Sequence, residues 1–126
     1  MQRNKQIEKL DTLFSKLIRI RDGKCLRCGT IHGLECSHTI TREDIQYRWD
    51  FMNAITLCYR CHRNWHQYQE EGKQWMQKNL PEFYNYYIDN RYKLSQFKVD
   101  LDEVLKLLKE KEKEYNSIKP SYLLNL

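Results

Sequence analysis

Residues 25–66 read CLRCGTIHGLECSHTITREDIQYRWDFMNAITLCYRCHRNWH, and this stretch decides how the chain is organised. Two C-x2-C pairs stand at its ends, Cys25 with Cys28 and Cys58 with Cys61. Four thiolates in two such pairs can bind one tetrahedral Zn²⁺ ion and leave it no open coordination position. Gly29 follows the first pair, where a tight turn favours a residue that tolerates positive φ. The stretch therefore predicts a structural zinc site that joins two distant segments.

The chain has 126 residues, 40% of them hydrophobic, and we expect a single domain from this length. No apolar run is long enough to cross a bilayer, and the N-terminal MQRNKQIEKL lacks the apolar core of a secretory signal. We therefore expect a cytoplasmic protein with no membrane partner, in a compartment where cysteines serve as metal ligands more often than as disulfides. Cys36, the fifth cysteine, is left over, either as a small packing residue or as a further ligand-like thiol near a metal.

The charge of the chain is mildly basic. The formal net charge is +5, and four zinc-bound thiolates with their ion would reduce it to about +3. Such a bias permits nucleic-acid binding without demonstrating it. Arg19, Arg21 and Lys24 precede the first cysteine pair, where a solvated face and phosphate contact are equal interpretations. The guanidinium groups of Arg42 and Arg48 suit bidentate phosphate contacts.

The N-terminal segment has the period of an amphipathic helix. Apolar residues recur every three or four positions between residues 2 and 22, at Ile7, Leu10, Phe14, Leu17 and Ile18. Gly23 suits the end of this helix. A shorter helix capped by Asp11 or Thr12 is the alternative.

A β-hairpin is predicted between the cysteine pairs. Residues 34–40 alternate as a short strand that places His38 on one face with Leu34 and Cys36, and residues 54–57 form a second short strand. Residues 41–52 form the loop between them. Asn53 would tie this loop through hydrogen bonds to the backbone, or it is an ordinary turn residue.

The second cysteine pair opens a helix that runs through about Gln69. His62 and His66 are four residues apart, so they lie on the same face of this helix. That spacing suits two imidazole ligands on one divalent ion. We expect Gly72 to end the helix.

The C-terminal part, residues 70–126, is predicted to be helical. One helix runs to about Asn79, another from Pro81 to about Tyr92, and their aromatic residues favour packing over base stacking. Asp100 would cap a last helix, and Pro120 begins a loose tail. The apolar stripe of the last helix needs a partner, which is either the N-terminal helix or a second subunit; its residues are Leu101, Val104, Leu105, Leu108 and Tyr115. The fold class is thus α+β, mostly helical.

The combined motif resembles the HNH endonuclease superfamily, which has a ββα-metal fold. The resemblance rests on both cysteine pairs, the Glu35-Cys36-Ser37-His38 run, Asn53, and the histidines after Cys61. It covers residues 11–69 and is most similar to small phage and prophage HNH proteins, including the NinG/Rap recombination group.

The resemblance assigns roles residue by residue. It implies that His38 is the general base, that Asn53 orients it, and that His62 and His66 bind a catalytic Mg²⁺ or Mn²⁺. Many members have Asp or His immediately before the base, where this chain has Ser37, so Ser37 would be at most a weak contributor to the metal.

The resemblance further implies a metal-dependent endonuclease that makes nicks or double-strand breaks in DNA, with branched recombination intermediates among its substrates. The alternative is a non-catalytic zinc module that binds nucleic acid or a recombination or packaging partner. A homodimer formed through the C-terminal helix would bury the apolar stripe of that helix.

Overall fold

A computed structural model describes residues 2–93 and 98–118 of the chain. The predicted tail from Pro120 lies outside these residues. The elements in chain order are α1 (Arg3–Asp22), β1 (Leu34–His38), the 3-10 helix η1 (Phe51–Asn53), β2 (Ala54–Cys58), α2 (Tyr59–Gln67), α3 (Gln69–Asn79), α4 (Pro81–Asn90) and α5 (Leu101–Ile118). The predicted class, α+β and mostly helical, is confirmed. Among the described residues, each helix is too short or too polar to span a lipid bilayer.

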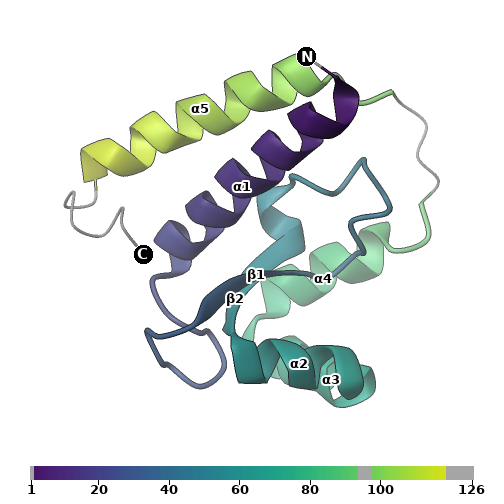
Figure 1. Cartoon of the computed structure of the whole chain (residues 1–126). Coiled ribbons are helices and arrows are strands. Elements are labelled where there is room, and N and C mark those ends of the chain that lie inside the picture. The colour runs from purple at the N-terminus through teal and green to yellow at the C-terminus, as the bar shows by residue number, and fades with distance from the viewer. Residues whose placement is uncertain (1, 94–97, 119–126) are drawn as a thin grey trace.

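The hairpin of β1 and β2 lies between two groups of helices, with α1 and α5 on one side and α2, α3 and α4 on the other (Figure 1). The strands are antiparallel, and His38 is opposite Ala54. All five residues of β2 are buried. Strand β1 ends at His38, two residues earlier than predicted, and the Ile40 N–H donates to the side chain of Asn53 instead of to a strand. The hairpin therefore forms the centre of the molecule.

Helix α1 is continuous from Arg3, so the alternative of a shorter helix beginning near Asp11 is wrong. Its apolar face contributes Leu10, Phe14, Leu17 and Ile18 to the core. Gly23 ends the helix in the left-handed region, with a φ of 70°.

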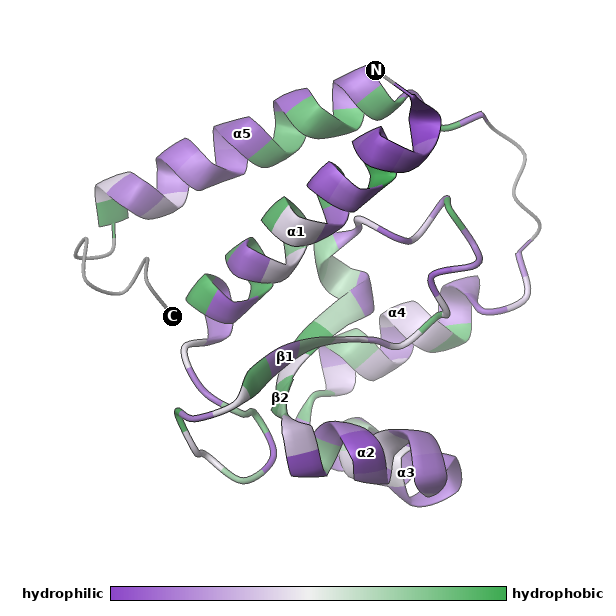
Figure 2. Cartoon of the chain, viewed as in Figure 1, coloured by the Kyte–Doolittle hydropathy of each residue, from purple (hydrophilic) through white to green (hydrophobic). Residues whose placement is uncertain are grey.

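Helix α5 packs along α1 and runs in the same direction (Figure 1). Most of its hydrophobic residues pack against the core that α1 shares, although Leu107 and Ile118 are exposed, and hydrophilic residues cover its outer face (Figure 2). The Asp100 side chain caps the helix by accepting from the backbone N–H groups of Asp102 and Glu103. Because α1 of the same chain covers the apolar stripe, the stripe is no longer a reason to expect a homodimer.

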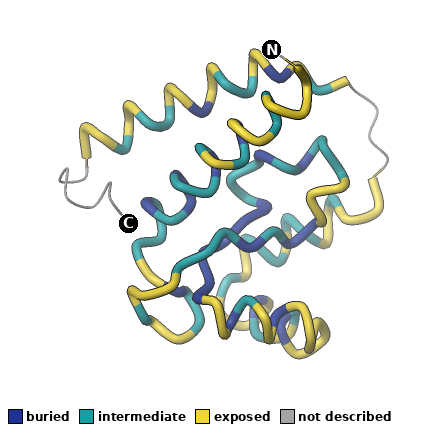
Figure 3. Tube along the Cα trace, in the orientation of Figure 1, coloured by how far each residue is buried: buried dark blue, intermediate teal, exposed yellow. Residues whose placement is uncertain are grey.

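The segment after α2 differs from the prediction at Gly72. This glycine does not end a helix; it lies buried inside α3. A Cβ atom at this position would lie 2.8 Å from the Trp65 ring of α2, so glycine permits the two helices to approach closely. The outer surfaces of α2 and α3 are largely exposed (Figure 3).

Candidate functional site

The four paired cysteines come together as predicted. Among the residues that the structure describes, they are the one group of three or more His, Cys, Asp or Glu side chains whose ligand atoms all lie within 4.8 Å of one another. The Sγ atoms of Cys28 and Cys58 are 3.7 Å apart. A Zn–S distance of about 2.3 Å in a tetrahedron places sulfur atoms about 3.8 Å apart. The cluster can therefore hold one tetrahedral ion such as Zn²⁺.

The backbone around the cluster is arranged to stabilise negative sulfur. In each pair the N–H of the second cysteine donates to the first, over 3.4 Å to Cys25 Sγ and 3.5 Å to Cys58 Sγ. Burial acts to raise the pKa of Cys25, but backbone N–H donors outweigh it and lower the pKa to about 6. Burial and the neighbouring sulfurs raise the pKa of Cys61, because four thiolates repel one another without a cation. Gly29 has the predicted positive φ, at 82°.

A second feature is a cleft of about 590 Å³ between α1, β1, the following loop and α2. We call it the histidine cleft, because three of the four histidines line it. Its lining residues are Asp11, Ser15, Glu35, Cys36, His38, Thr41, Arg42, Glu43, Arg48, His62 and His66. The structure thus brings the predicted base and both predicted helical ligands to one cavity.

The imidazole of His38 is held by the loop that follows β1. Its Nε2 atom lies 2.8 Å from the backbone oxygen of Arg48, and its ring packs at 5.6 Å from the ring of Phe14 in α1. A carbonyl only accepts, so Nε2 carries the proton and Nδ1 of the neutral ring has the lone pair. Burial lowers the pKa of His38, and the positive charge of Arg42 adds to this effect. The ring therefore stays neutral at neutral pH.

Asn53 ties the loop as the sequence predicts. Its side chain is fully buried; Oδ1 accepts from the Ile40 N–H at 2.7 Å, and Nδ2 donates to the carbonyls of Ile40 and Tyr47 at 3.0 Å each. Its own carbonyl accepts from Thr39. These bonds fix both ends of the loop that carries the Arg48 carbonyl. Asn53 is therefore linked to His38 through the backbone of this loop.

His62 and His66 of α2 face each other, with their Nε2 atoms 3.1 Å apart. The other ring nitrogen of His62, Nδ1, lies 2.8 Å from a carboxylate oxygen of Glu35 on β1. Burial lowers the pKa of His66, and the nearby His62 and Lys73 contribute in the same direction. Sequence reasoning assigned no role to Glu35, because only the packing of the hairpin against α2 brings its carboxylate to His62.

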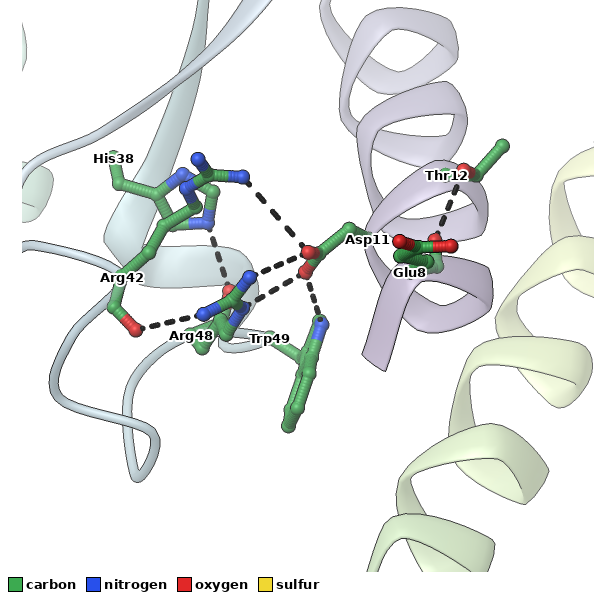
Figure 4. Close-up of polar contacts among 7 residues, drawn as sticks. All are labelled: Glu8, Asp11, Thr12, His38, Arg42, Arg48 and Trp49. Atoms are coloured by element: carbon green, nitrogen blue, oxygen red, sulfur yellow. Dashed lines mark hydrogen bonds and ion pairs between the residues drawn. The ribbon is translucent and has the colours of Figure 1, made fainter. Parts of the chain in front are cut away.

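Asp11 is a further residue that sequence reasoning missed. From the middle of α1 its carboxylate accepts two hydrogen bonds from Arg48 and one from the indole Nε1 of Trp49, at 3.0 Å (Figure 4). The Arg42 guanidinium lies 3.8 Å from the same carboxylate but is largely exposed. Arg48, predicted to contact phosphate, is therefore paired within the fold, whereas Arg42 presents its charge to the cleft.

The predicted phosphate contacts before the first cysteine pair are not at the cleft. Arg21 instead donates to the backbone oxygens of Phe51 and Ala54 and pairs with Asp22, so it joins the end of α1 to the hairpin. Arg19 bonds to the carbonyl of Ser15 one turn earlier. Lys24 is exposed. None of Arg19, Arg21 and Lys24 is among the residues that line the cleft, and the guanidinium of Arg21 is engaged within the fold.

Cys36 lines the cleft with His38, as strand alternation predicts, and Ser37 lies on the other side of the strand, away from the cleft. Ser37 is 1% exposed, lies outside the cleft lining, and has no hydrogen-bond partner for its hydroxyl among the described residues. The predicted weak contribution of Ser37 to a catalytic metal is therefore not supported. Cys36 lies outside the four-cysteine cluster, as predicted, and burial raises its thiol pKa to about 12. Glu35 departs from the alternation, because it lines the same cleft as Cys36 and His38.

The cleft combines a neutral imidazole on a strand, two imidazoles on a helix, and an exposed guanidinium. Such a set can accept a proton from water, bind a divalent cation with open positions, and attract an anion. Comparison of the chain with protein-family models, curated proteins and solved structures found no match. The function is therefore argued from the geometry of the cleft.

Proposed function

We propose that this protein is a metal-dependent endonuclease of the HNH type, which hydrolyses phosphodiester bonds in DNA around a structural Zn²⁺ core. The observation that carries the proposal is that His38 from β1 and the His62–His66 pair from α2 line the same cleft. A base on one element and a pair of ligands for one metal ion on another can act on one phosphate from two sides. Residues 11–69 would form the catalytic core and residues 70–126 its helical extension.

His62 and His66 fit a divalent cation. Adjacent ligands on an octahedral ion at about 2.1 Å lie about 3.0 Å apart, and their Nε2 atoms are separated by 3.1 Å. When bound, such a cation would supply positive charge to the phosphate and to the departing 3′ oxygen. Both Mg²⁺ and Mn²⁺ remain candidates, and the two nitrogen donors favour Mn²⁺ because Mg²⁺ prefers oxygen ligands.

His38 would act as the general base. Its Nε2 proton is held by the Arg48 carbonyl, so Nδ1 is the nitrogen that can take a proton from water. The resulting hydroxide would attack phosphorus, the bond from phosphorus to the 3′ oxygen would break, and this oxygen would take a proton from solvent water. The products would be a 5′-phosphate and a 3′-hydroxyl. Arg42, which is exposed in the cleft, would attract the phosphate. Asn53 would hold the loop that orients His38.

A non-catalytic nucleic-acid-binding module is the second hypothesis. Such a module would bind nucleic acid through Arg42, Arg48 and the basic N-terminal helix. The Asp11 carboxylate neutralises Arg48, and Arg21 is bonded to the hairpin backbone. These contacts leave fewer basic groups for a binding surface than the sequence suggested, whereas all three cleft histidines are in place. Branched DNA as a substrate, phage recombination partners and a cytoplasmic location follow from the sequence and its resemblance alone.

The test is nicking of supercoiled plasmid by zinc-loaded protein with Mg²⁺, Mn²⁺ or EDTA, with zinc content measured in each sample. We expect divalent-dependent nicking that His38→Ala abolishes while folding and DNA binding persist. His32→Ala is the matched control, because His32 is exposed and lies outside the histidine cleft. Salt-sensitive DNA binding without nicking under any cation would favour the binding module. Normal nicking by the His38 variant would remove His38 as the base.

A further inference from the structure

The imidazole of His62 makes polar contacts on both of its nitrogen edges. Nδ1 lies 2.8 Å from Glu35 Oε1, and Nε2 lies 3.1 Å from His66 Nε2. Glu35 comes from β1, while both histidines come from α2, so the contact joins strand to helix at the wall of the cleft. The two nitrogens of an imidazole point in different directions. Glu35 therefore occupies the edge that faces away from His66.

The contact with Glu35 decides which nitrogen of His62 carries the proton. An ionised carboxylate can only accept, so Nδ1 must donate to Glu35. The neutral ring then has its lone pair on Nε2, the atom beside His66. If Glu35 were absent, water would serve either nitrogen and both tautomers would be populated. The carboxylate thus selects the form of His62 that can bind a cation through Nε2.

We propose that Glu35 is a positioning residue for a divalent cation held by His62 and His66. This inference rests on the proposed function for the location of the cation. Glu35 is not assigned as a direct ligand, because it contacts the Nδ1 edge and does not join both histidines in a group with all ligand atoms within 4.8 Å. Carboxylates that accept from a metal-bound histidine fix its tautomer and orientation and increase its basicity. Glu35 would also supply a negative charge near the cation. Ser37, the residue before the proposed base, carries no charge and cannot do so.

An ordinary surface ion pair is the competing explanation. The side chain of Glu35 is 42% exposed and that of His62 is 21% exposed, which also suits a contact with no role in metal binding. The two explanations differ in one measurable respect. A surface pair leaves the affinity of the protein for a cation unchanged when Glu35 is removed, whereas a positioning residue does not.

The test is a Mn²⁺ titration of zinc-loaded full-length protein, with free Mn²⁺ measured by electron paramagnetic resonance. For Glu35→Ala we expect the Mn²⁺ dissociation constant to rise about 10- to 100-fold, with zinc content and thermal midpoint unchanged. Glu35→Gln, which keeps an acceptor oxygen without the charge, should fall between this variant and wild type. Glu43→Ala is the control for general charge, because Glu43 is a second exposed carboxylate of the cleft. We expect less than a twofold change for it.

A spectroscopic readout tests the tautomer itself. In metal-free protein the ¹⁵N shifts of the His62 ring should show a protonated Nδ1, and Glu35→Ala should shift them toward a mixture of both forms. Wild-type Mn²⁺ affinity in Glu35→Ala, an equal loss in Glu43→Ala, or no Mn²⁺ binding by wild type would overturn the proposal. A Mn²⁺ affinity that depends on Glu35, in a protein that does not nick DNA, would leave this inference standing and reject the nuclease. Nicking by a protein whose Mn²⁺ affinity does not depend on Glu35 would support the nuclease and reject this inference.

Discussion

The carboxylate of Asp11 in α1 receives two hydrogen bonds from the guanidinium of Arg48, at 2.9 Å to Oδ1 and 2.5 Å to Oδ2. The carbonyl of the same arginine holds the Nε2 atom of His38. Helix α1 is therefore connected to the proposed base through a single loop residue. Because this connection involves the backbone, a change in α1 can move the imidazole without touching it.

Removal of the Asp11 carboxylate should weaken the fold. In Asp11→Ala the guanidinium of Arg48 and the indole N–H of Trp49 lose their acceptor, at a cost of about 1–3 kcal/mol in the free energy of unfolding. Glu8→Ala is the matched control, an exposed acid on the same helix. Urea denaturation measures both. Equal effects of the two substitutions would contradict the assigned role.

The contribution of Asp11 should depend on pH. Burial acts to raise the pKa of Asp11, but the hydrogen bonds and charge of Arg48 outweigh it, so the pKa is lowered from 3.8. A lowered carboxyl pKa stabilises the fold above the unfolded value and loses this contribution as the pH falls through the folded value. The stability difference between wild type and Asp11→Ala should therefore be complete above pH 5 or so and shrink in stronger acid. If the stability difference between the two proteins grew on acidification, the pKa of Asp11 would be raised in the fold, which would contradict this prediction.

Asn53→Ala should unfasten the loop after β1. The substitution leaves three buried backbone groups, the N–H and carbonyl of Ile40 and the carbonyl of Tyr47, without their side-chain partner. We expect a loss of about 3 kcal/mol in the free energy of unfolding and a fall in nicking. Asn64→Ala, at an exposed position of α2, should change neither. Denaturation together with amide exchange of residues 39–48 measures the effect; unchanged protection there would disprove it.

Substitutions should separate the cysteines that bind zinc from the one that does not. Cys58→Ser is expected to lose the bound zinc and the folded state, because metal binding is part of the folding free energy of such a site. Cys36→Ala should retain one zinc per chain, because Cys36 lies outside the cluster. Zinc content and circular dichroism distinguish the classes. A folded, zinc-free Cys58 variant would show that the cluster is dispensable.

Nicking should depend on the neutral form of His38. Burial lowers the pKa of His38 from its ordinary value of 6.5, so the rate should rise with pH and reach half its maximum below pH 6.5. As the pH falls, His38 takes up a proton in the unfolded chain, where its pKa is ordinary, before it does so in the folded chain. The fold therefore loses stability as the pH falls below 6.5. A rate profile with saturating Mn²⁺ measures the midpoint. A midpoint above pH 7 would exclude His38 in this environment as the titrating base.

Gly72→Ala should destabilise the contact between α2 and α3. The added Cβ would lie 2.8 Å from the buried Trp65 ring. Overpacking costs about 1–3 kcal/mol, and alanine returns about 1 kcal/mol of helix propensity, so a small net loss is expected. Gln77→Ala, at an exposed position of the same helix, is the control for propensity. A higher thermal midpoint for Gly72→Ala would show that the ring can move aside.

Local patterns predicted most of the elements. The period of apolar residues located α1 and α5, and the alternation and turn residues indicated the hairpin. The prediction at Gly72 was wrong because a glycine that permits close packing cannot be distinguished by sequence from one that ends a helix. The partner of α5 was also left open, since an apolar stripe does not specify which surface will cover it.

By itself the sequence determined the two cysteine pairs and the helical spacing of His62 and His66, because residue type and short spacing fix geometry within one or two turns of chain. That the two pairs meet was predicted from the four ligands that one tetrahedral ion takes. The tie made by Asn53 was one of two interpretations, and the structure decided between them. Only the tertiary structure decided that Asp11 pairs with Arg48, that Glu35 faces His62, and that Ser37 is buried. Those relationships join separate elements. They depend on the twist and register of the hairpin and on how α1 and α2 pack against it, which no local pattern encodes.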